Sequence, residues 1–372
     1  MQARQFDWVK WSIWGVIAAG LIWGLFFADK GLQAIFDGVH SGSILLLGAV
    51  GLTLTYKILN FANFAHGDIL IFGAYVAFSL DWWLTKALPS LFPDLGADKA
   101  ALQWVAISLA LVGGVMGAMA LAWLIDRVLY RRMRHSAPVV LVIATFGMAL
   151  FVRNLVQAMW GVGNRRYDML VSTPQVYGFG DVNLDGAQEF FSLATRPWNE
   201  LIRTPDFHYS FALSLNLMDI VTLAVAFCLA ILLHVFLKYG RTGKAMRAMS
   251  DNVDLARVSG INTERMVAWT WAIGSGMAAI AGVFMGLNFA VIEPNTGAKT
   301  LLPMFAAVIL GGIGSPYGAM LGALVIGVAQ TLLVAPVTAI SSQYKPGIAF
   351  VLMILMLLVR PQGLLGEAGR KG

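Results

Sequence analysis

The sequence is a series of apolar segments separated by short polar stretches. A helix needs about 20 apolar residues to cross roughly 30 Å of hydrocarbon. The candidates, in chain order, are Trp11–Phe27, Ser41–Tyr56, Ile69–Leu84, Trp104–Ile125, Val139–Trp160, Met218–Leu237, Met266–Val291, Gly318–Val337 and Ile348–Val359. A further segment, Leu301–Leu310, is too short to cross as a helix. The sequence therefore predicts an all-α, polytopic transmembrane helical bundle of about eight to ten spans, two of them short or re-entrant.

Composition excludes a soluble fold. The chain is 58% hydrophobic and 12% charged, whereas ordinary globular proteins carry about 25% charged residues. The formal net charge of +6 does not indicate nucleic-acid binding, because the basic residues form short clusters between apolar runs. Membrane lipid is the expected surrounding. The single cysteine, Cys228, permits neither an intrachain disulfide nor a cysteine-based metal cluster, and no metal or cofactor is expected on this chain.

The distribution of Lys and Arg predicts the topology. Arg4 and Lys10 precede the segment Trp11–Phe27, which lacks a small-residue cleavage site and is interpreted as an uncleaved helix. A cytoplasmic N-terminus puts 16 of the 26 Lys and Arg residues inside and 9 outside, with Arg153 within a segment. Because cytoplasmic loops are enriched in basic residues, both termini are expected in the cytoplasm.

Two polar regions stand out by length. Residues 161–217 mix acidic, basic and aromatic side chains, which favours a small folded extracytoplasmic cap over a disordered linker. Residues 238–265 form the longest predicted cytoplasmic loop. No other domain boundary is evident, so residues 1–372 are expected to form one transmembrane domain that includes both regions.

Two short stretches, Asn60–Asp68 and Gly311–Gly318, interrupt the apolar pattern. Irregular backbone at membrane depth survives only where protein or a water-filled cavity satisfies it, and paired interruptions indicate the binding region of a transporter. We expect the two stretches to approach each other and line a solute route. The candidate route residues are Asn60, Asn63, His66, Gly311, Gly312, Gly314 and Ser315.

Both stretches are also compatible with tight cytoplasmic turns. Asn and Gly favour turns, and Asp68 could cap the following helix. His66 could handle protons or be a hydrogen-bonded structural residue. The Gly-rich stretch could equally serve close helix packing.

Several motifs resemble the LivH-type permeases of branched-chain amino acid ABC importers. They run in the order of that family from about residue 40 to the C-terminus. The matching motifs are Gly51-Leu-Thr-Leu-Thr-Tyr56, Asn63-Phe-Ala-His-Gly-Asp68 with Gly73-Ala-Tyr75, Ala256-x-x-x-Gly260-Ile-Asn262, Gly311-Gly-Ile-Gly-Ser315 with Gly318-Ala-Met-Leu-Gly322, and Arg360-Pro-Gln-Gly-Leu-Leu365. The region 165–217 is longer than expected for the family.

The resemblance implies a bacterial inner-membrane permease domain that works with other chains. The implied partners are a homologous second permease (LivM-like) or a second copy, two cytoplasmic ABC ATPase subunits, and a periplasmic substrate-binding protein. ATP and Mg²⁺ would be used on the ATPases. In agreement, Gly240-Arg-Thr-Gly243-Lys244 lacks the spacing of a phosphate-binding P-loop and follows a membrane segment rather than a strand.

The loop 238–265 is expected to couple the chain to an ATPase. Three- and four-residue steps place Met246, Met249, Val253 and Ala256 on one face of a helix predicted over Met246–Gly260. Something must cover that apolar face: a partner groove, which by resemblance is the ATPase, or the membrane surface or the chain itself. The candidate coupling residues are Met246, Met249, Asp251, Val253, Asp254, Ala256 and Gly260.

The leading hypothesis is a non-enzymatic permease subunit for branched-chain or related small amino acids. The alternative is an ion-coupled secondary transporter of small amphipathic solutes that uses His66 and Asp68 as ion or proton ligands. An intramembrane enzyme is disfavoured, because these two residues lie two positions apart and point to different sides of a helix.

Overall fold

The computed structural model describes residues 31–93, 99–134, 136–167, 177–179, 213–215, 217–334 and 344–366. Seven helices in these ranges are long and apolar enough to cross a membrane. The long helices are α2 (Gly31–Leu59), α3 (His66–Leu91), α5 (Lys99–Ile125), α7 (Pro138–Trp160), α9 (Leu217–Tyr239), α12 (Thr263–Phe289) and α14 (Pro316–Val334). They confirm the predicted polytopic helical fold, while the predicted segment Trp11–Phe27 lies outside the described residues.

The remaining helices are short. Two apolar ones, α13 (Thr296–Gly311) and α15 (Lys345–Val359), confirm the expectation of two short membrane segments. The polar connections contain the π-helix η1 (Asp126–Tyr130), α6 (Arg131–Met133), α10 (Arg241–Asp251) and α11 (Val253–Val258).

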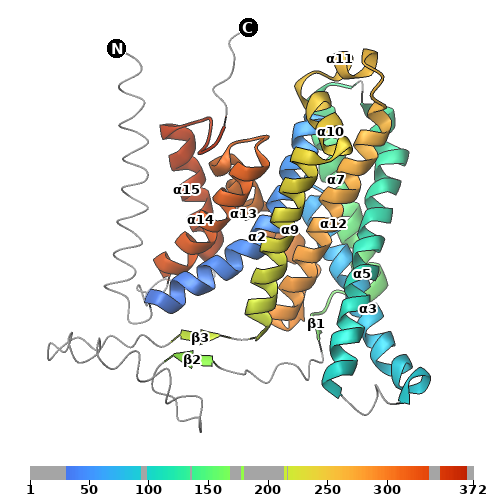
Figure 1. Ribbon diagram of the computed structural model, residues 1–372, viewed down its shortest axis with the longest axis vertical. Helices are drawn as coiled ribbons and strands as arrows, with labels where there is room; N and C mark the ends of the chain where they lie inside the picture. The colour runs from blue at the N-terminus through green and yellow to red at the C-terminus, as the bar shows by residue number, and fades with distance from the viewer. Residues whose placement is uncertain are drawn as a thin grey trace, which may run out of the picture.

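Four short strands lie at one end of the bundle, shown at the bottom of Figure 1. Strand β1 (Arg165–Arg166) pairs antiparallel with β4 (Val291–Ile292). Strand β2 (Tyr177–Phe179) pairs antiparallel with β3 (Leu213–Leu215). Most of the predicted cap, 161–217, lies outside the described residues, so its folding stays a prediction.

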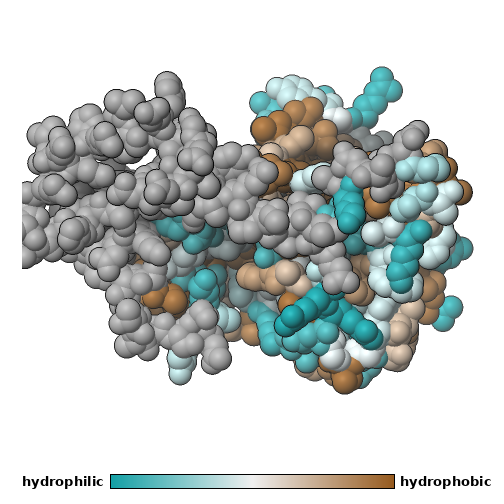
Figure 2. Space-filling model, turned by 90° about the horizontal axis from the view of Figure 1, so that it is seen from below, coloured by the Kyte–Doolittle hydropathy of each residue, from teal (hydrophilic) through white to brown (hydrophobic). Residues whose placement is uncertain are grey.

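The opposite end of the bundle carries α10 and α11, with α11 outermost (Figure 1). We call the two ends the loop end (α10 and α11) and the strand end (β1–β4). Figure 2 looks onto the strand end, where hydrophilic and apolar residues lie side by side on the coloured part of the surface.

Small residues bring the central helices close together. A Cβ added to Gly38 of α2 would lie 2.6 Å from Cα of Val328 in α14. A Cβ on Gly51 of α2 would lie 2.5 Å from the carbonyl oxygen of Gly274 in α12. Membrane helices that lack side chains at their contacts gain close van der Waals packing. The bundle is therefore built around α2, with α12 and α14 against it.

Candidate functional site

The stretch Asn60–Asp68 turns the chain back into the bundle. Asn60 adopts a left-handed conformation (φ 56°), and its N–H donates to the carbonyl of Tyr56 at 2.9 Å, which ends α2. Farther on, His66 Nε2 lies 2.9 Å from the carbonyl oxygen of Gly48. Gly48 lies roughly 16 Å along α2 from Leu59, at about 1.5 Å per residue. Helix α3 therefore begins well inside the bundle, not at its end.

Two predicted route residues in this stretch have clear structural roles. The side-chain oxygen of Asn63 accepts from the N–H of Ala65 at 3.1 Å, a local turn of the kind that Asn favours. His66 is fully buried, and because a carbonyl can only accept, its Nε2–H donates to Gly48. These contacts support the turn and structural interpretations; whether either residue also contacts a solute stays a prediction.

Asp68 forms a buried ion pair instead of capping α3. The residue before the helix is Ala65, and no side chain caps that end. The Asp68 carboxylate accepts from Arg153 of α7, Nε to Oδ1 at 3.0 Å and Nη2 to Oδ2 at 3.1 Å. The cap interpretation is therefore wrong, because the only cation that the sequence places within an apolar segment needs this carboxylate as its partner.

The start of α3 meets the start of α13. A Cβ on Gly67 would lie 2.9 Å from the carbonyl carbon of Gly297, and one on Gly297 would lie 2.7 Å from that of Gly67. The two helix starts therefore touch backbone to backbone at the depth that His66 marks.

An ion pair lies beside this junction. Lys299 Nζ is 2.9 Å from Glu293 Oε2, and the side chains are 63% and 31% exposed. Charged groups at membrane depth face a bundle interior, a partner or a water-filled cavity, because hydrocarbon solvates them poorly. The exposed side of α13 that carries Lys299 is thus expected to face such a space. Sequence analysis missed this pair.

From the ion pair towards the C-terminal end of α13, the same side of the helix is apolar. Phe64, next to the start of α3, lies 5.1 Å from Phe305 of α13 and 6.3 Å from Phe146 of α7, measured between ring centroids. Leu302, between Lys299 and Phe305 on the helix, is exposed. We define this surface as the α13 face: Glu293, Lys299, Leu302, Phe305, Phe64 and Phe146. This face combines one cation, one anion and an adjacent apolar surface.

The Gly-rich stretch lies at the other end of α13. Gly312 and Gly314 have φ of 111° and 83°, a conformation that glycine adopts without strain. Ser315 Oγ accepts from the N–H of Gly318 at 3.1 Å and so caps α14. Gly311 packs against the backbone of Gly318, as the close-packing interpretation expects.

The Gly-rich stretch lies far from the junction between the starts of α3 and α13. Gly311 is roughly 21 Å along α13 from Gly297, and Gly314 faces Lys57 near the end of α2. Gly312 packs against Gly366, near the C-terminus. The start of α3 therefore meets the start of α13 and not the Gly-rich stretch, which approaches the other end of Asn60–Asp68 through Lys57. That the two stretches line one route stays a prediction.

The predicted coupling helix Met246–Gly260 is two helices. The chain breaks at Asn252, whose side chain accepts from the N–H of Leu255 at 2.9 Å and caps α11. The break arises because Asn competes for backbone hydrogen bonds and favours a helix start. Gly260 follows α11 with φ 82°.

The apolar face of the coupling loop is covered by the chain itself. Met246 and Met249 are 1% and 2% exposed, and Ala256 is also buried. They belong to one core cluster with Met266 and Trp271 of α12. The prediction that the methionines dock into an ATPase is therefore wrong. Val253 is half-buried, whereas Asp251 and Asp254 are exposed.

A different apolar pair is exposed on α11. Leu255 is 63% and Val258 is 81% exposed. They are three residues apart and share one helical face, at the outermost point of the loop end (Figure 1). We call this pair the α11 tip. The sequence does contain the three-residue spacing of Leu255 and Val258. The longer pattern of Met246, Met249, Val253 and Ala256 pointed to a different face of the loop.

An aromatic column joins the loop core to the broken stretch. Tyr130 of η1 stacks on Trp271, with centroids 5.4 Å apart and rings inclined by 14°. The ring of Phe61 lies 5.5 Å from that of Tyr130, between centroids, and is inclined to it by 57°. All three belong to the cluster that contains Met246 and Met249. Helices α10 and α12 are thus in packing contact with the segment that leads into α3.

Known proteins resemble this chain along most of its length. A family model described as the permease component of branched-chain amino acid transport systems matches residues 34–357. The high-affinity branched-chain amino acid transport system permease protein LivH of Escherichia coli K12 is 34% identical over 336 residues, covering 90% of this chain and 96% of that protein. BraD of Pseudomonas aeruginosa, a permease protein of the same description, is 31% identical with the same coverage. A branched-chain amino acid transport permease protein LivM of Methanocaldococcus jannaschii is 33% identical over 139 residues, 34% of this chain and 39% of that protein. No solved structure matches.

Proposed function

The chain belongs to the family of permease components of branched-chain amino acid transport systems, and we propose that it is the membrane-spanning permease subunit of an ATP-driven importer of branched-chain or related small amino acids. The observation that carries this proposal is the match to the family and to LivH over nearly the whole of both chains. In this function ATP is hydrolysed on separate subunits. This chain supplies the route and no catalytic group.

The proposal implies an assembly. Weaker similarity to a LivM permease supports a homologous second permease as partner, with a second copy of this chain as the other possibility. Two cytoplasmic ATPases and a periplasmic binding protein complete the importer. The loop end then faces the cytoplasm of a bacterial inner-membrane protein, with both chain termini on that side.

The route runs along the α13 face. An amino acid is a zwitterion, and this surface offers it one cation, Lys299, and one anion, Glu293, already paired with each other. Leu302, Phe305 and Phe64 offer an apolar surface to its side chain. When the solute binds, its carboxylate pairs with Lys299 and its ammonium group pairs with Glu293, in place of the Lys299–Glu293 pair. The charges of the solute therefore stay compensated while it passes. The second permease forms the opposite wall.

Coupling uses the α11 tip. Leu255 and Val258 are the exposed apolar residues of α11, and an apolar helix face fits a hydrophobic groove on a partner. Displacement of α11 then reaches the start of α3 through the buried methionines and the column Trp271–Tyr130–Phe61. Packed elements of this kind shift between discrete arrangements rather than deform continuously.

The ion-coupled alternative is less well supported. It needs His66 and Asp68 as free ligands, but His66 is bonded to Gly48 and Asp68 to Arg153. The family match also favours the importer subunit.

Co-purification tests the assembly. The tagged chain, expressed with its native neighbours and extracted in mild detergent, should bring down an ATPase and a permease, identified by mass spectrometry. A chain that purifies alone and accumulates solute in response to an ion gradient would support the secondary transporter instead.

Cysteine labelling tests the orientation. In a Cys228→Ala background, Gly163→Cys lies at the strand end, where an added Cβ meets no atom within 4 Å. Ser259→Cys lies exposed at the loop end. A membrane-impermeant maleimide should label the first in intact cells whose outer membrane is permeabilised, and the second only after the inner membrane is opened. The reverse pattern contradicts the orientation.

A further inference from the structure

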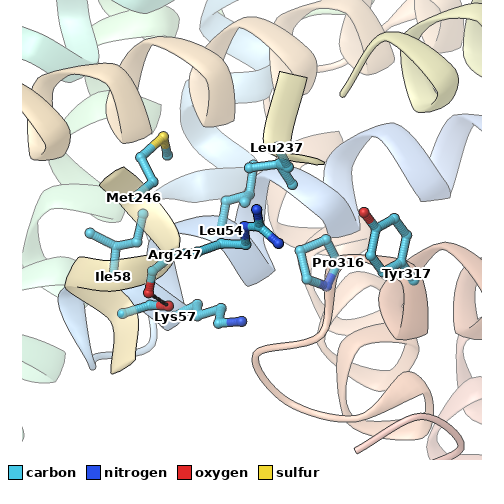
Figure 3. A pocket seen from close by; sticks show the side chains of 9 residues that line it. Leu54, Lys57, Ile58, Leu237, Met246, Arg247, Pro316 and Tyr317 are labelled. Carbon is cyan, nitrogen blue, oxygen red and sulfur yellow. Dashed lines mark hydrogen bonds between the residues drawn. The ribbon is translucent and has the colours of Figure 1, made fainter. Parts of the chain in front are cut away.

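A pocket opens between four helices at the loop end (Figure 3). It measures about 90 Å³, far more than the 10–15 Å³ or so that one water needs on this measure. Helices α2, α9, α10 and α14 line it with Leu54, Lys57, Ile58, Leu237, Met246, Arg247, Ser250, Pro316 and Tyr317. Its walls are thus largely apolar, with few polar groups.

Within the part of the chain that the structure describes, the pocket carries positive charge only. Lys57 and Arg247 are its two basic residues, and no acidic residue lines it. Among the described residues, neither cation has a carboxylate within ion-pair distance, and Arg247 Nη2 donates only to the carbonyl of Lys238 at 3.4 Å. Two cations from different helices at one apolar pocket favour an anionic ligand.

The surroundings of the pocket are apolar on the membrane side. His234 of α9 lies 5.3 Å from the ring of Tyr317, between ring centroids. On α14, the lining residue Tyr317 and Leu321, one turn further along the same helical face, are both exposed. An occupant with long apolar chains can therefore lie along α14 while its charged group reaches Lys57 and Arg247.

We propose that this pocket binds the headgroup of an anionic phospholipid of the cytoplasmic leaflet. The phosphate lies between Lys57 and Arg247, and the acyl chains follow the exposed face of α14 that carries Tyr317 and Leu321. Basic pockets between transmembrane helices at the cytoplasmic side are suited to such headgroups. The binding step does not depend on which solute is carried. Its location at the membrane–cytoplasm boundary rests on the orientation proposed above.

Such a lipid links α10 of the coupling loop to helices α2 and α14. Arg247 and Met246 belong to α10, Lys57 to α2 and Pro316 to the start of α14. A phosphate held by α2 and α10 together stabilises one relative position of these helices. Anionic lipid is therefore expected to raise the thermal stability of the purified protein and to modulate ATP hydrolysis by the complex.

Native mass spectrometry of the purified complex tests the proposal. The probes are dioleoyl phosphatidylglycerol, dioleoyl phosphatidylcholine, inorganic phosphate and leucine, each titrated separately. One phosphatidylglycerol should bind at least tenfold more tightly than phosphatidylcholine. The double variant Lys57→Gln/Arg247→Gln should lose about 30-fold in that affinity, or about 2 kcal/mol at 1.4 kcal/mol per factor of ten.

Lys244→Gln is the matched control, since Lys244 is an exposed cation on α10 that does not line the pocket. It should bind phosphatidylglycerol as the wild type does, and the single variants Lys57→Gln and Arg247→Gln should each show part of the loss. Equal loss in the control, no loss in the double variant, or equal binding of the two lipids overturns the proposal. Competition by phosphate or leucine at matched concentration also overturns it, because phosphate would assign the pocket to a small anion and leucine would assign it to the solute. Failure of the importer proposal leaves this result unchanged, because no arm measures transport.

Discussion

Arg153 and Asp68 join the middle of α7 to the first turn of α3 by two parallel hydrogen bonds of 3.0 and 3.1 Å. The carboxylate is 1% exposed. A bidentate guanidinium–carboxylate pair fixes both the distance and the orientation of the groups it joins. Because α3 begins inside the bundle, this pair positions the helix start that meets α13.

Removal of the cation should destabilise the protein strongly. Arg153→Met leaves a buried carboxylate unpaired, which typically costs about 3–5 kcal/mol. The double variant Arg153→Met/Asp68→Leu should recover much of that loss, because it removes both charges. Thermal unfolding of the purified protein, followed by static light scattering and fluorescence, measures the difference. Equal melting temperatures for Arg153→Met and the wild type would show that the pair contributes little.

The glycine contact between α3 and α13 should tolerate no side chain. In Gly67→Val, the Cβ meets the carbonyl of Gly297, so the two helix starts must separate, at a typical overpacking cost of about 1–3 kcal/mol or more. Gly147→Val, on α7, is the control because a Cβ there meets no atom within 4 Å. Yield of folded protein by size-exclusion chromatography should fall for the first variant only. A similar fall in both would mean that the contact has no special role.

The two apolar faces of the coupling loop should respond differently to a charge. Met249→Glu buries a carboxylate in the core around Trp271 and should cost several kcal/mol of stability. Leu255→Glu and Val258→Glu place it on the exposed α11 tip and should leave folding intact while weakening ATPase binding at least tenfold.

Unfolding temperature and ATPase co-purification separate the two effects. The account predicts an unstable Met249→Glu and a stable, ATPase-free Leu255→Glu. Retention of the ATPase at wild-type level by the Leu255→Glu/Val258→Glu double variant would remove the α11 tip as the docking surface.

Lys299→Gln should reduce transport without affecting stability. Its partner Glu293 is partly exposed, and exposed ion pairs contribute about 0–1 kcal/mol to folding. Uptake should fall at least tenfold, because the solute carboxylate loses its cation. Lys244→Gln, an exposed lysine at the loop end, is the control and should transport normally. Normal uptake by Lys299→Gln would place the route elsewhere.

The membrane segments were predictable because span length and hydropathy are set by the bilayer, not by tertiary contacts. Each predicted segment from Ser41–Tyr56 onward overlaps a helix, although Val291 lies in strand β4 and residues 335–337 lie outside the described ranges. The depth of the α3 start was not predictable, because a polar break such as Asn60–Asp68 has the same composition at the surface and inside the bundle.

The candidate site was harder to predict for the same kind of reason. The period of Met246 and Met249 indicates a covered face but not what covers it, and here the chain covers it itself. The Asp68–Arg153 pair did leave a signal: a lone arginine in an apolar segment requires an anionic partner. Lys299 left none, because only the contact of Gly67 with Gly297 places it at depth.

Uptake into proteoliposomes distinguishes an ATP-driven importer from an ion-driven transporter. The co-purified complex is reconstituted with its binding protein outside and ATP inside, and radiolabelled leucine, isoleucine and valine are offered with lysine and glutamate as comparisons. The account predicts that at least one branched-chain amino acid accumulates only with internal ATP, and that a proton or sodium gradient without ATP drives none. Accumulation driven by an ion gradient in liposomes that contain this chain alone would contradict it.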